Sequence, residues 1–125
     1  MAEEVRRITP EERVEADPTP GMLRERAIEA GALWSGLLTT EPHVTSGWHH
    51  HGDHETSIYV VDGALRMESG PGGGQVLEAG PGDFLHVPPH TVHRESNPGD
   101  TAAHAVVTRS GHGQVTVNVD GPEPG

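Results

Sequence analysis

"TSIYVVDGALRMESGPGGGQVLEAGPGDFLHVPPHTVHRES", residues 56–96, is a series of short apolar runs separated by turn signals. TSIYVV is rich in β-branched and aromatic residues, and ALRMES alternates apolar with charged residues at a period of two. The sequences DG, GPGGG and GPGD, which separate the runs, are typical of turns and loops. AAHAVVTR and QVTVNV continue the series, so the pattern predicts an all-β sandwich or barrel.

The size and composition of the chain favour a single small β domain. Its 125 residues fit one domain with one hydrophobic core. The 17 glycines and 11 prolines favour many turns and short strands over long helices. With 2 Trp, 1 Tyr and 1 Phe, the core has to be built mainly from aliphatic side chains.

The charge of the chain argues against two classes of partner. The 8 Lys and Arg against 19 Asp and Glu give a formal net charge of -11. Such a surface repels phosphate backbones and anionic lipids, so we expect no nucleic-acid partner and no membrane partner. No stretch approaches the roughly 18 apolar residues of a membrane helix, and the N-terminal segment lacks an apolar signal core. With no cysteine in the chain, we expect a cytoplasmic protein.

The two ends differ in composition from the middle of the chain. Residues 1–21 are charged and proline-rich, and we expect a flexible arm that is either disordered or lies on a neighbouring subunit. Residues 22–119 are the expected β-barrel, and residues 120–125 a frayed tail. The composition of MLRERAIEAGALW, residues 22–34, suits a helix. Gly31 interrupts it, however, and the overlapping ALWSGLLTTEP is typical of a strand, so we predict two short strands.

The segment SGWHHHGDHET, residues 46–56, contains 4 of the 10 histidines. Side chains two residues apart in an extended segment share a face, so His49 and His51 project together and can chelate one ion. His93 follows Pro88-Pro89 in a β-rich run and is the natural third ligand. The alternative to a metal site is a solvated polar surface, which we prefer for four histidines: His43, His50, His90 and His112.

GDFLHVPPHTVHRESN, residues 82–97, resembles the second of the two motifs of cupins, which are small jelly-roll barrels. That motif runs Gly, five residues, Pro-x-Gly, two residues, His, three residues, Asn. His90 stands at its second glycine, in a tight turn, so we expect an unusual backbone conformation there. The resemblance covers roughly residues 32–119 and implies a cupin-type jelly-roll β-barrel, also called a double-stranded β-helix.

The first cupin motif fits less completely. It runs Gly, five residues, His-x-His, three or four residues, Glu, six residues, Gly, and His43 stands at its first glycine. Three residues separate His51 from Glu55, but seven residues separate Glu55 from Gly63. Counted back from Gly63, the glutamate position falls on Thr56.

The resemblance implies His49, His51 and His93 as metal ligands. Glu55 is the fourth ligand if a one-residue bulge turns it inward; otherwise the site has three histidines with water in the remaining positions. His54 is a further candidate. Such a ligand set suits a divalent transition metal, with Fe, Mn, Ni, Co, Cu and Zn all admissible.

The resemblance leaves several functions open. Cupins include dioxygenases, isomerases, decarboxylases and non-catalytic binders, and the fold does not choose among them. We expect a metal-dependent enzyme, an oxygenase or isomerase, that acts on a small oxygenated metabolite, with O₂ as an optional co-substrate. The alternatives are a barrel that binds or senses a small-molecule ligand, and a barrel with a structural ion. Because cupins commonly pair and open sheet edges invite pairing, we expect a homodimer.

Further residues are candidates for the lining of the barrel. Trp48, Tyr59 and Phe84 fit the cavity wall, although we favour the core for these aromatic side chains. His104 lies in the apolar run AAHAVV and fits either the core or a role beside the site. We expect Arg94 and Glu95 to be solvated surface charges.

Overall fold

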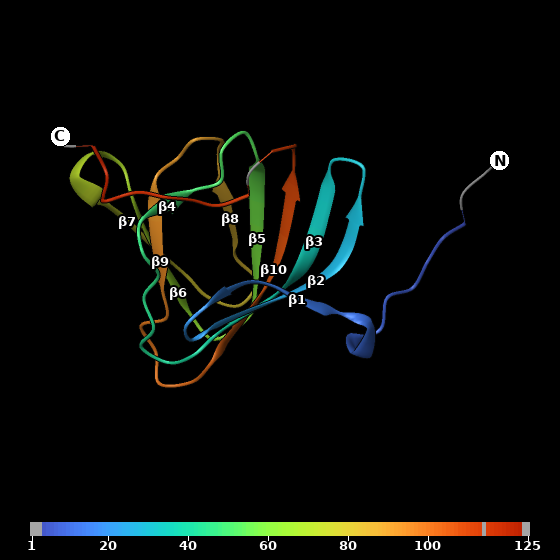
Figure 1. Cartoon of the computed structure of the whole chain (residues 1–125). Coiled ribbons are helices and arrows are strands. Elements are labelled where there is room, and N and C mark those ends of the chain that lie inside the picture. Colours follow the sequence, from blue (N-terminus) through green and yellow to red (C-terminus); the bar gives the residue numbers. More distant parts are fainter. Residues whose placement is uncertain (1–3, 114, 124–125) are drawn as a thin grey trace.

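The computed structural model describes residues 4–113 and 115–123. Its strands form two antiparallel sheets that face each other, which confirms the predicted all-β jelly-roll barrel (Figure 1). The larger sheet has the order β1 (Val14–Thr19), β2 (Met22–Ala30), β3 (Leu33–Thr40), β10 (Ala103–Ser110), β5 (Glu55–Asp62), β8 (Phe84–Val87). The smaller sheet has the order β11 (Val117–Asn118), β4 (His49–His50), β9 (His93–Ser96), β6 (Leu65–Ser69), β7 (Gln75–Ala79).

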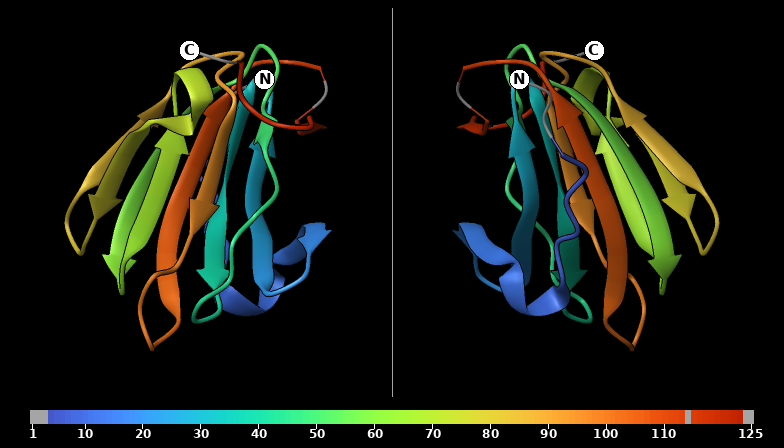
Figure 2. Two further views of the ribbon diagram at one scale, coloured as in Figure 1. Left: turned by 90° about the vertical axis from the view of Figure 1, so that its left-hand side faces the viewer. Right: turned by 90° about the vertical axis from the view of Figure 1, so that its right-hand side faces the viewer.

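The two helical segments of the described residues are single 3₁₀ turns, η1 (Pro10–Glu12) and η2 (Pro71–Gly73). Neither could span a membrane. Figure 2 shows the strands of the larger sheet side by side, with the smaller sheet forming the second layer.

The core lies between the sheets and is aliphatic, as the composition predicts. Successive side chains of a strand point to opposite faces, so the period-two pattern of β5 buries Ile58 and Val60. The same alternation applies to the other strands. The buried core consists of Met22, Leu38, Ile58, Val60, Leu65, Met67, Ala79, Leu85, Val87, Ala103, Ala105 and Val107. The core placement of Trp48, Tyr59 and Phe84 is wrong: none of them belongs to this cluster, and Phe84 is 70% exposed.

The N-terminal part of the structure differs from the expected arm. Residues 22–34 form β2 and the start of β3, the two strands predicted there. The sheet also extends into residues 1–21, because β1 pairs with β2. The six residues of β1 are exposed or half-buried. This edge strand therefore lacks the alternation of apolar and polar residues by which a strand is recognised in a sequence. Ahead of η1 the chain runs away from the sheets (Figure 1).

The turn residues of the two motifs have defined roles in the fold. His90 has a φ of 57°, so the expected left-handed conformation at this glycine position is confirmed. Gly63 has a φ of 76°, and a Cβ there would lie 2.7 Å from the Cα of Ala103. The buried Asn97 side chain donates to the carbonyl oxygens of Thr40 (3.0 Å) and Thr101 (2.8 Å). Asn97 therefore fixes the loop that leads into β10.

Candidate metal centre

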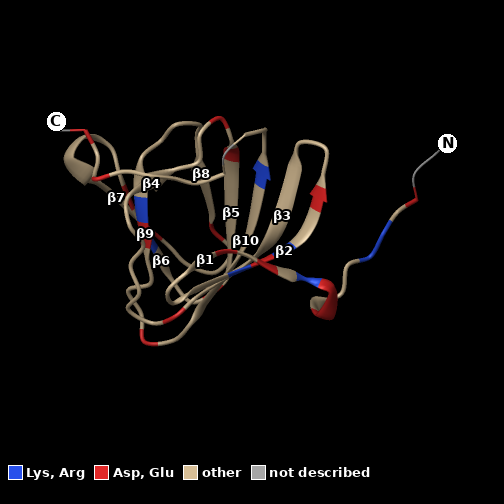
Figure 3. Ribbon diagram, viewed as in Figure 1, with Lys and Arg blue, Asp and Glu red and all other residues tan. Residues whose placement is uncertain are grey.

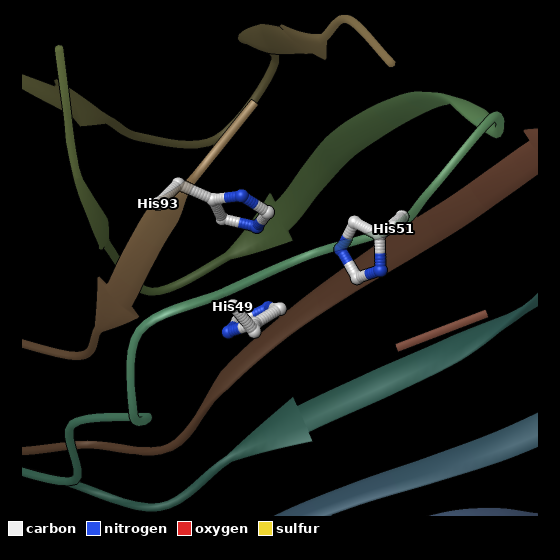
Figure 4. A group of neighbouring side chains, drawn as sticks. All are labelled: His49, His51 and His93. Atoms are coloured by element: carbon white, nitrogen blue, oxygen red, sulfur yellow. The ribbon is translucent and has the colours of Figure 1, made fainter. Parts of the chain in front are cut away.

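Three of the predicted ligands meet inside the barrel. His49 and His93 are direct cross-strand partners in β4 and β9, and His51 lies two residues after His49. Their side chains share the inward face and are 4%, 1% and 6% exposed, respectively. Figure 4 shows the three rings gathered around one point, with ring centroids 4.3 to 5.0 Å apart. One nitrogen from each ring lies within 4.8 Å of the other two.

Backbone carbonyls determine which nitrogen of each ring is free. Every Nδ1 of the three imidazoles lies at hydrogen-bond distance from a carbonyl oxygen, which can only accept. The pairs are His49 with Gly47 at 2.9 Å, His51 with Val115 at 2.8 Å and His93 with Thr91 at 2.9 Å. Nδ1 therefore carries the proton and Nε2 keeps its lone pair, the arrangement in which histidine binds metals.

The lone pair of His49 shows that the site fits an ion. Its Nε2 is buried and has no hydrogen-bond partner among the described residues. A buried polar atom without a partner costs about 1–3 kcal/mol, which a bound ion offsets. The group also has the imidazole nitrogens that transition metals prefer, so the donor set fits such an ion.

Burial keeps the imidazoles of His49 and His51 neutral. It lowers the pKa of His51 from 6.5 to about 2, and the positive charge of Arg109 contributes to this shift. Burial also lowers the pKa of His49, with a smaller contribution from His93. Since metals bind the neutral ring, these two ligands need no deprotonation step at pH 7.

The structure does not bring Glu55 to the three histidines. Its side chain is 53% exposed at the start of β5 and accepts a hydrogen bond from Nε2 of His86 at 3.0 Å. The next residue, Thr56, is 1% exposed and faces into the barrel. Thr56 also satisfies both counts of the motif, with four residues after His51 and six before Gly63. A threonine thus stands where the resemblance places the glutamate.

A bulge does not restore Glu55. The pairing of β5 with β10 shifts register between His104 and Ala105, opposite Val60 and Asp62 at the far end of β5. Between Glu55 and Val60 the alternation is unbroken, so Glu55 stays on the outer face.

The remaining candidate histidines lie outside the group. His54 is buried and its Nδ1 is bonded to the carbonyl oxygen of His51 at 2.9 Å, but it does not belong to the group of three whose nitrogens lie within 4.8 Å of one another. His50 accepts a hydrogen bond from the backbone of Gly52. His104 faces outward and lies 2.6 Å from Asp62, so neither a core position nor a role beside the site applies to it.

Cavities reach the group from two sides. A polar cavity of about 240 Å³ is lined by His49, Arg24 and Ser46, among others. A larger cavity of about 440 Å³ is lined by His93 and by apolar side chains, including Phe84, the candidate wall residue that the structure places there. The larger volume lies in the range of small-ligand sites, which starts near about 300 Å³.

Buried charges are the feature that the sequence did not reveal. The expectation that Glu95 is a surface charge is wrong: it is 4% exposed, and Arg24 lies 3.5 Å from it as an ion pair. Its position two residues after the inward-facing His93 was the available signal. Arg94 is half-buried, and its Nη2 donates to Glu68 at 2.8 Å.

Comparison with known proteins agrees with this fold. The cupin domain family matches residues 36–109, so the chain belongs to the cupin family. A stretch of 45 residues is 42% identical to quercetin 2,3-dioxygenase of Bacillus subtilis; it covers 36% of this chain and 12% of that enzyme.

Solved structures with a similar fold include two that match over nearly their whole length and one that matches over part of its length. KdgF from Halomonas sp. has a TM-score of 0.72 and 23% identity, covering 85% of this chain and 94% of that one. An uncharacterized double-stranded β-helix protein from Klebsiella pneumoniae has a TM-score of 0.73 and 20% identity, covering 93% and 98%. Oxalate decarboxylase from Bacillus subtilis has a TM-score of 0.71 and 21% identity, covering 82% and 28%. At these identities the likeness shows the fold alone.

The lowered pKa of His51 predicts how the metal-free protein responds to acid. This imidazole takes up a proton near pH 6.5 when unfolded, but only near pH 2 when folded. The unfolded state binds more protons between these values, so the stabilising contribution is complete above pH 6.5 and is lost as the pH falls. We expect the free energy of unfolding to drop by up to about 1.4 kcal/mol per pH unit for this residue, measured by urea unfolding from about pH 7 to about pH 5.

One variant separates His51 from the other titrating groups. His51→Gln removes its contribution and flattens the pH dependence of the free energy of unfolding. Equal slopes in the wild type and His51→Gln would contradict the assignment.

Proposed function

We propose that this cupin is a metal-dependent enzyme that acts on a small, oxygen-bearing molecule. The observation that carries the proposal is the set of three buried imidazoles whose Nε2 lone pairs share one point. The likeness to quercetin 2,3-dioxygenase, though confined to 45 residues, supports an oxygenase over an isomerase.

A bound divalent ion would supply a Lewis acid for an oxygen atom of the ligand. The protein contributes the rest of the site. His49, His51 and His93 fix the position of the ion, and their carbonyl-bonded Nδ1 atoms prevent the rings from rotating. The apolar wall near His93 takes the hydrocarbon part of the ligand and excludes water from it.

Thr56 favours a second candidate function, a barrel that binds a small ligand without turnover. In the described residues no carboxylate joins the three histidines, because Thr56 faces inward where the resemblance places a glutamate. A threonine hydroxyl cannot act as a general base at neutral pH as a carboxylate does. An activity assay therefore has to decide between enzyme and binding protein.

Metal content tests the site itself. We expect one equivalent of a divalent transition metal in wild-type protein purified without a histidine tag or metal resin, measured by elemental analysis. His51→Ala and His93→Ala each remove one of three ligands, so the content should fall to background. His50→Ala and Glu55→Gln are the matched controls, since neither side chain belongs to the group, and both should retain the metal. Unchanged metal in both alanine variants of the group would refute the site.

Oxygen consumption tests the proposed reaction class. Protein loaded with Fe(II), Mn or Ni should consume O₂ with at least one member of a panel of small hydroxylated or oxo compounds, and His93→Ala should not. Ligand binding without O₂ uptake or product in any metal form would instead support the binding function. A melting temperature that collapses after chelation of a catalytically silent protein would indicate a structural ion, because an ion bound by the native state stabilises it.

A cytoplasmic location stays a prediction. We also propose that the protein forms a homodimer. β8 and β7 are the outer strands at one edge of each sheet, and both expose apolar side chains: Phe84 is 70% exposed, Val76 52% and Leu77 51%. Burying these edges against a second copy removes apolar surface and open backbone groups from water. Light scattering at micromolar concentration should give twice the chain mass of 13.3 kDa, and a monomer mass would refute the dimer.

A further inference from the structure

Arg109 differs from the other arginines of the barrel. It is 4% exposed, and its Nε and Nη1 are buried without a hydrogen-bond partner. In the described residues no carboxylate lies within ion-pair distance of it. Each of the other arginines from residue 13 onward forms an ion pair with a carboxylate. The pairs are Arg13 with Glu25, Arg24 with Glu95, Arg26 with Glu29, Arg66 with Glu78, and Arg94 with Glu68.

The buried charges do not balance. Among the described residues, the buried Asp, Glu, Lys and Arg side chains are Arg24, Glu95 and Arg109, which leaves one uncompensated positive charge inside the barrel. The chain as a whole has a net charge of -11, so the buried charge is opposite in sign to that of the whole chain. Figure 3 shows where the acidic and basic residues lie along the ribbon. A buried charge without a partner is strongly destabilising, and a bound anion is the simplest means of compensation.

The surroundings of Arg109 form a small site. Arg109 on β10 pairs across the sheet with Trp34 on β3 and with Thr56 on β5, so the three side chains lie in one row on the inner face. The guanidinium carbon lies 4.9 Å from the centre of the Trp34 ring. The Oγ1 of Thr56 is also buried without a hydrogen-bond partner, as are Nε and Nη1 of Arg109. The row thus offers a charged donor and a hydroxyl side by side.

A cavity gives a ligand room beside this row. Its volume is about 190 Å³, and it is lined by Arg109, Trp34, His54, Val115 and Glu29 together with neighbouring residues. Thr56, although next to Arg109 in the sheet, is not part of this lining. This volume is below the roughly 300 Å³ of drug-sized sites, so the ligand has to be small. The carbonyl of Val115 accepts the hydrogen bond from His51, so the cavity wall continues into the metal centre.

We propose that Arg109, which lies against Trp34 in the cavity wall, binds the carboxylate group of a small organic acid. A single negative charge balances the single surplus positive charge, whereas a phosphate dianion would leave the interior negative. Carboxylate oxygens accept from guanidinium N–H groups in charge-assisted hydrogen bonds. The site goes beyond the proposed metal chemistry, because its charge, donors and cavity exist without an ion.

A purely structural role for Arg109 makes a different prediction. The ring contact with Trp34 alone would make Arg109 a packing element, as Arg94 is over Trp48 at 4.5 Å. Arg94, however, also has Glu68 as a partner, and Arg109 has none. If Arg109 serves an anion, replacing it with methionine removes an uncompensated charge and keeps or raises the melting temperature without ligand.

Fluorescence of Trp34 reports on the site. The chain has 2 tryptophans, so Trp48→Phe leaves Trp34 as the single tryptophan, which is excited selectively at a wavelength that tyrosine does not absorb. Metal-free protein in a buffer without carboxylate or phosphate is titrated with glycolate, with its neutral amide glycolamide and with inorganic phosphate. We expect a saturable change with glycolate, at least about tenfold weaker binding of glycolamide and phosphate, and loss of the response in Arg109→Met. Arg94→Met, the matched control, should bind glycolate as the parent protein does.

Several outcomes would overturn the proposal. These are no response to glycolate up to about 100 mM, equal binding of glycolamide, tighter binding of phosphate, or an unchanged response in Arg109→Met. A fall in the melting temperature of Arg109→Met by more than about 5 °C would mark Arg109 as structural. If that variant does not fold, the comparison of glycolate with glycolamide in the parent protein still decides the matter.

The same samples separate this inference from the proposed function. Metal analysis and a repeat titration with zinc-loaded protein are made alongside the fluorescence measurements. Glycolate binding in a protein that takes up no metal would refute the metal centre and leave the carboxylate site standing. Bound metal with no response to glycolate would refute the carboxylate site alone.

Discussion

The pairing of His49 with His93 across β4 and β9 is the constraint on which the centre depends. It places two imidazoles opposite each other on one face of the smaller sheet, and the period of two adds His51. These strands are short, since β4 has two residues and β9 four. The register is held from outside the pair, by the extension of β9 along β6 and by the hydrogen bond from Ser46 to the carbonyl of Glu95.

Backbone carbonyls, and not carboxylates, orient the three rings. A carbonyl contact fixes the tautomer without adding negative charge next to the ion. With Glu55 on the outer face and Thr56 on the inner one, the described residues supply no carboxylate to the group. The protein therefore leaves the charge of a bound ion largely uncompensated, which favours anionic or strongly polarised oxygen ligands.

The period of two along a strand predicted which site residues of a single strand face inward together. It paired His49 with His51, and the β-rich run after Pro88-Pro89 suggested His93, which the cupin resemblance then supported. It could not choose between Glu55 and Thr56, because one residue of loop before β5 reverses which of them faces the core. The same period of two predicts that Glu95 faces inward, because His93 does. It also predicts that Arg109 faces inward, because Ala105 and Val107 are buried. Charged side chains usually prefer the surface, and that preference argued against both positions.

The first strand was missed for a different reason. β1 lies at the edge of the larger sheet, and its side chains are exposed or half-buried, so its backbone pairing with β2 leaves no trace in hydropathy. The role of β1 is visible only in three dimensions. The carbonyl of Asp17 and the hydroxyl of Thr19 accept hydrogen bonds from Nη1 of Arg24, which holds Arg24 against Glu95. The segment that resembled an arm thus secures one of the buried charges.

An ion bound by the three histidines and the surplus charge of Arg109 would affect each other through electrostatics. Both are positive, so each would lower the affinity for the other in a medium of low dielectric constant. The sign of this interaction is already visible in His51, whose pKa the charge of Arg109 helps to lower. A carboxylate on Arg109 removes most of this repulsion and so raises the affinity for the ion, and reciprocity requires the ion to raise the affinity for the carboxylate equally. The barrel would then hold both ligands together more tightly than either one alone.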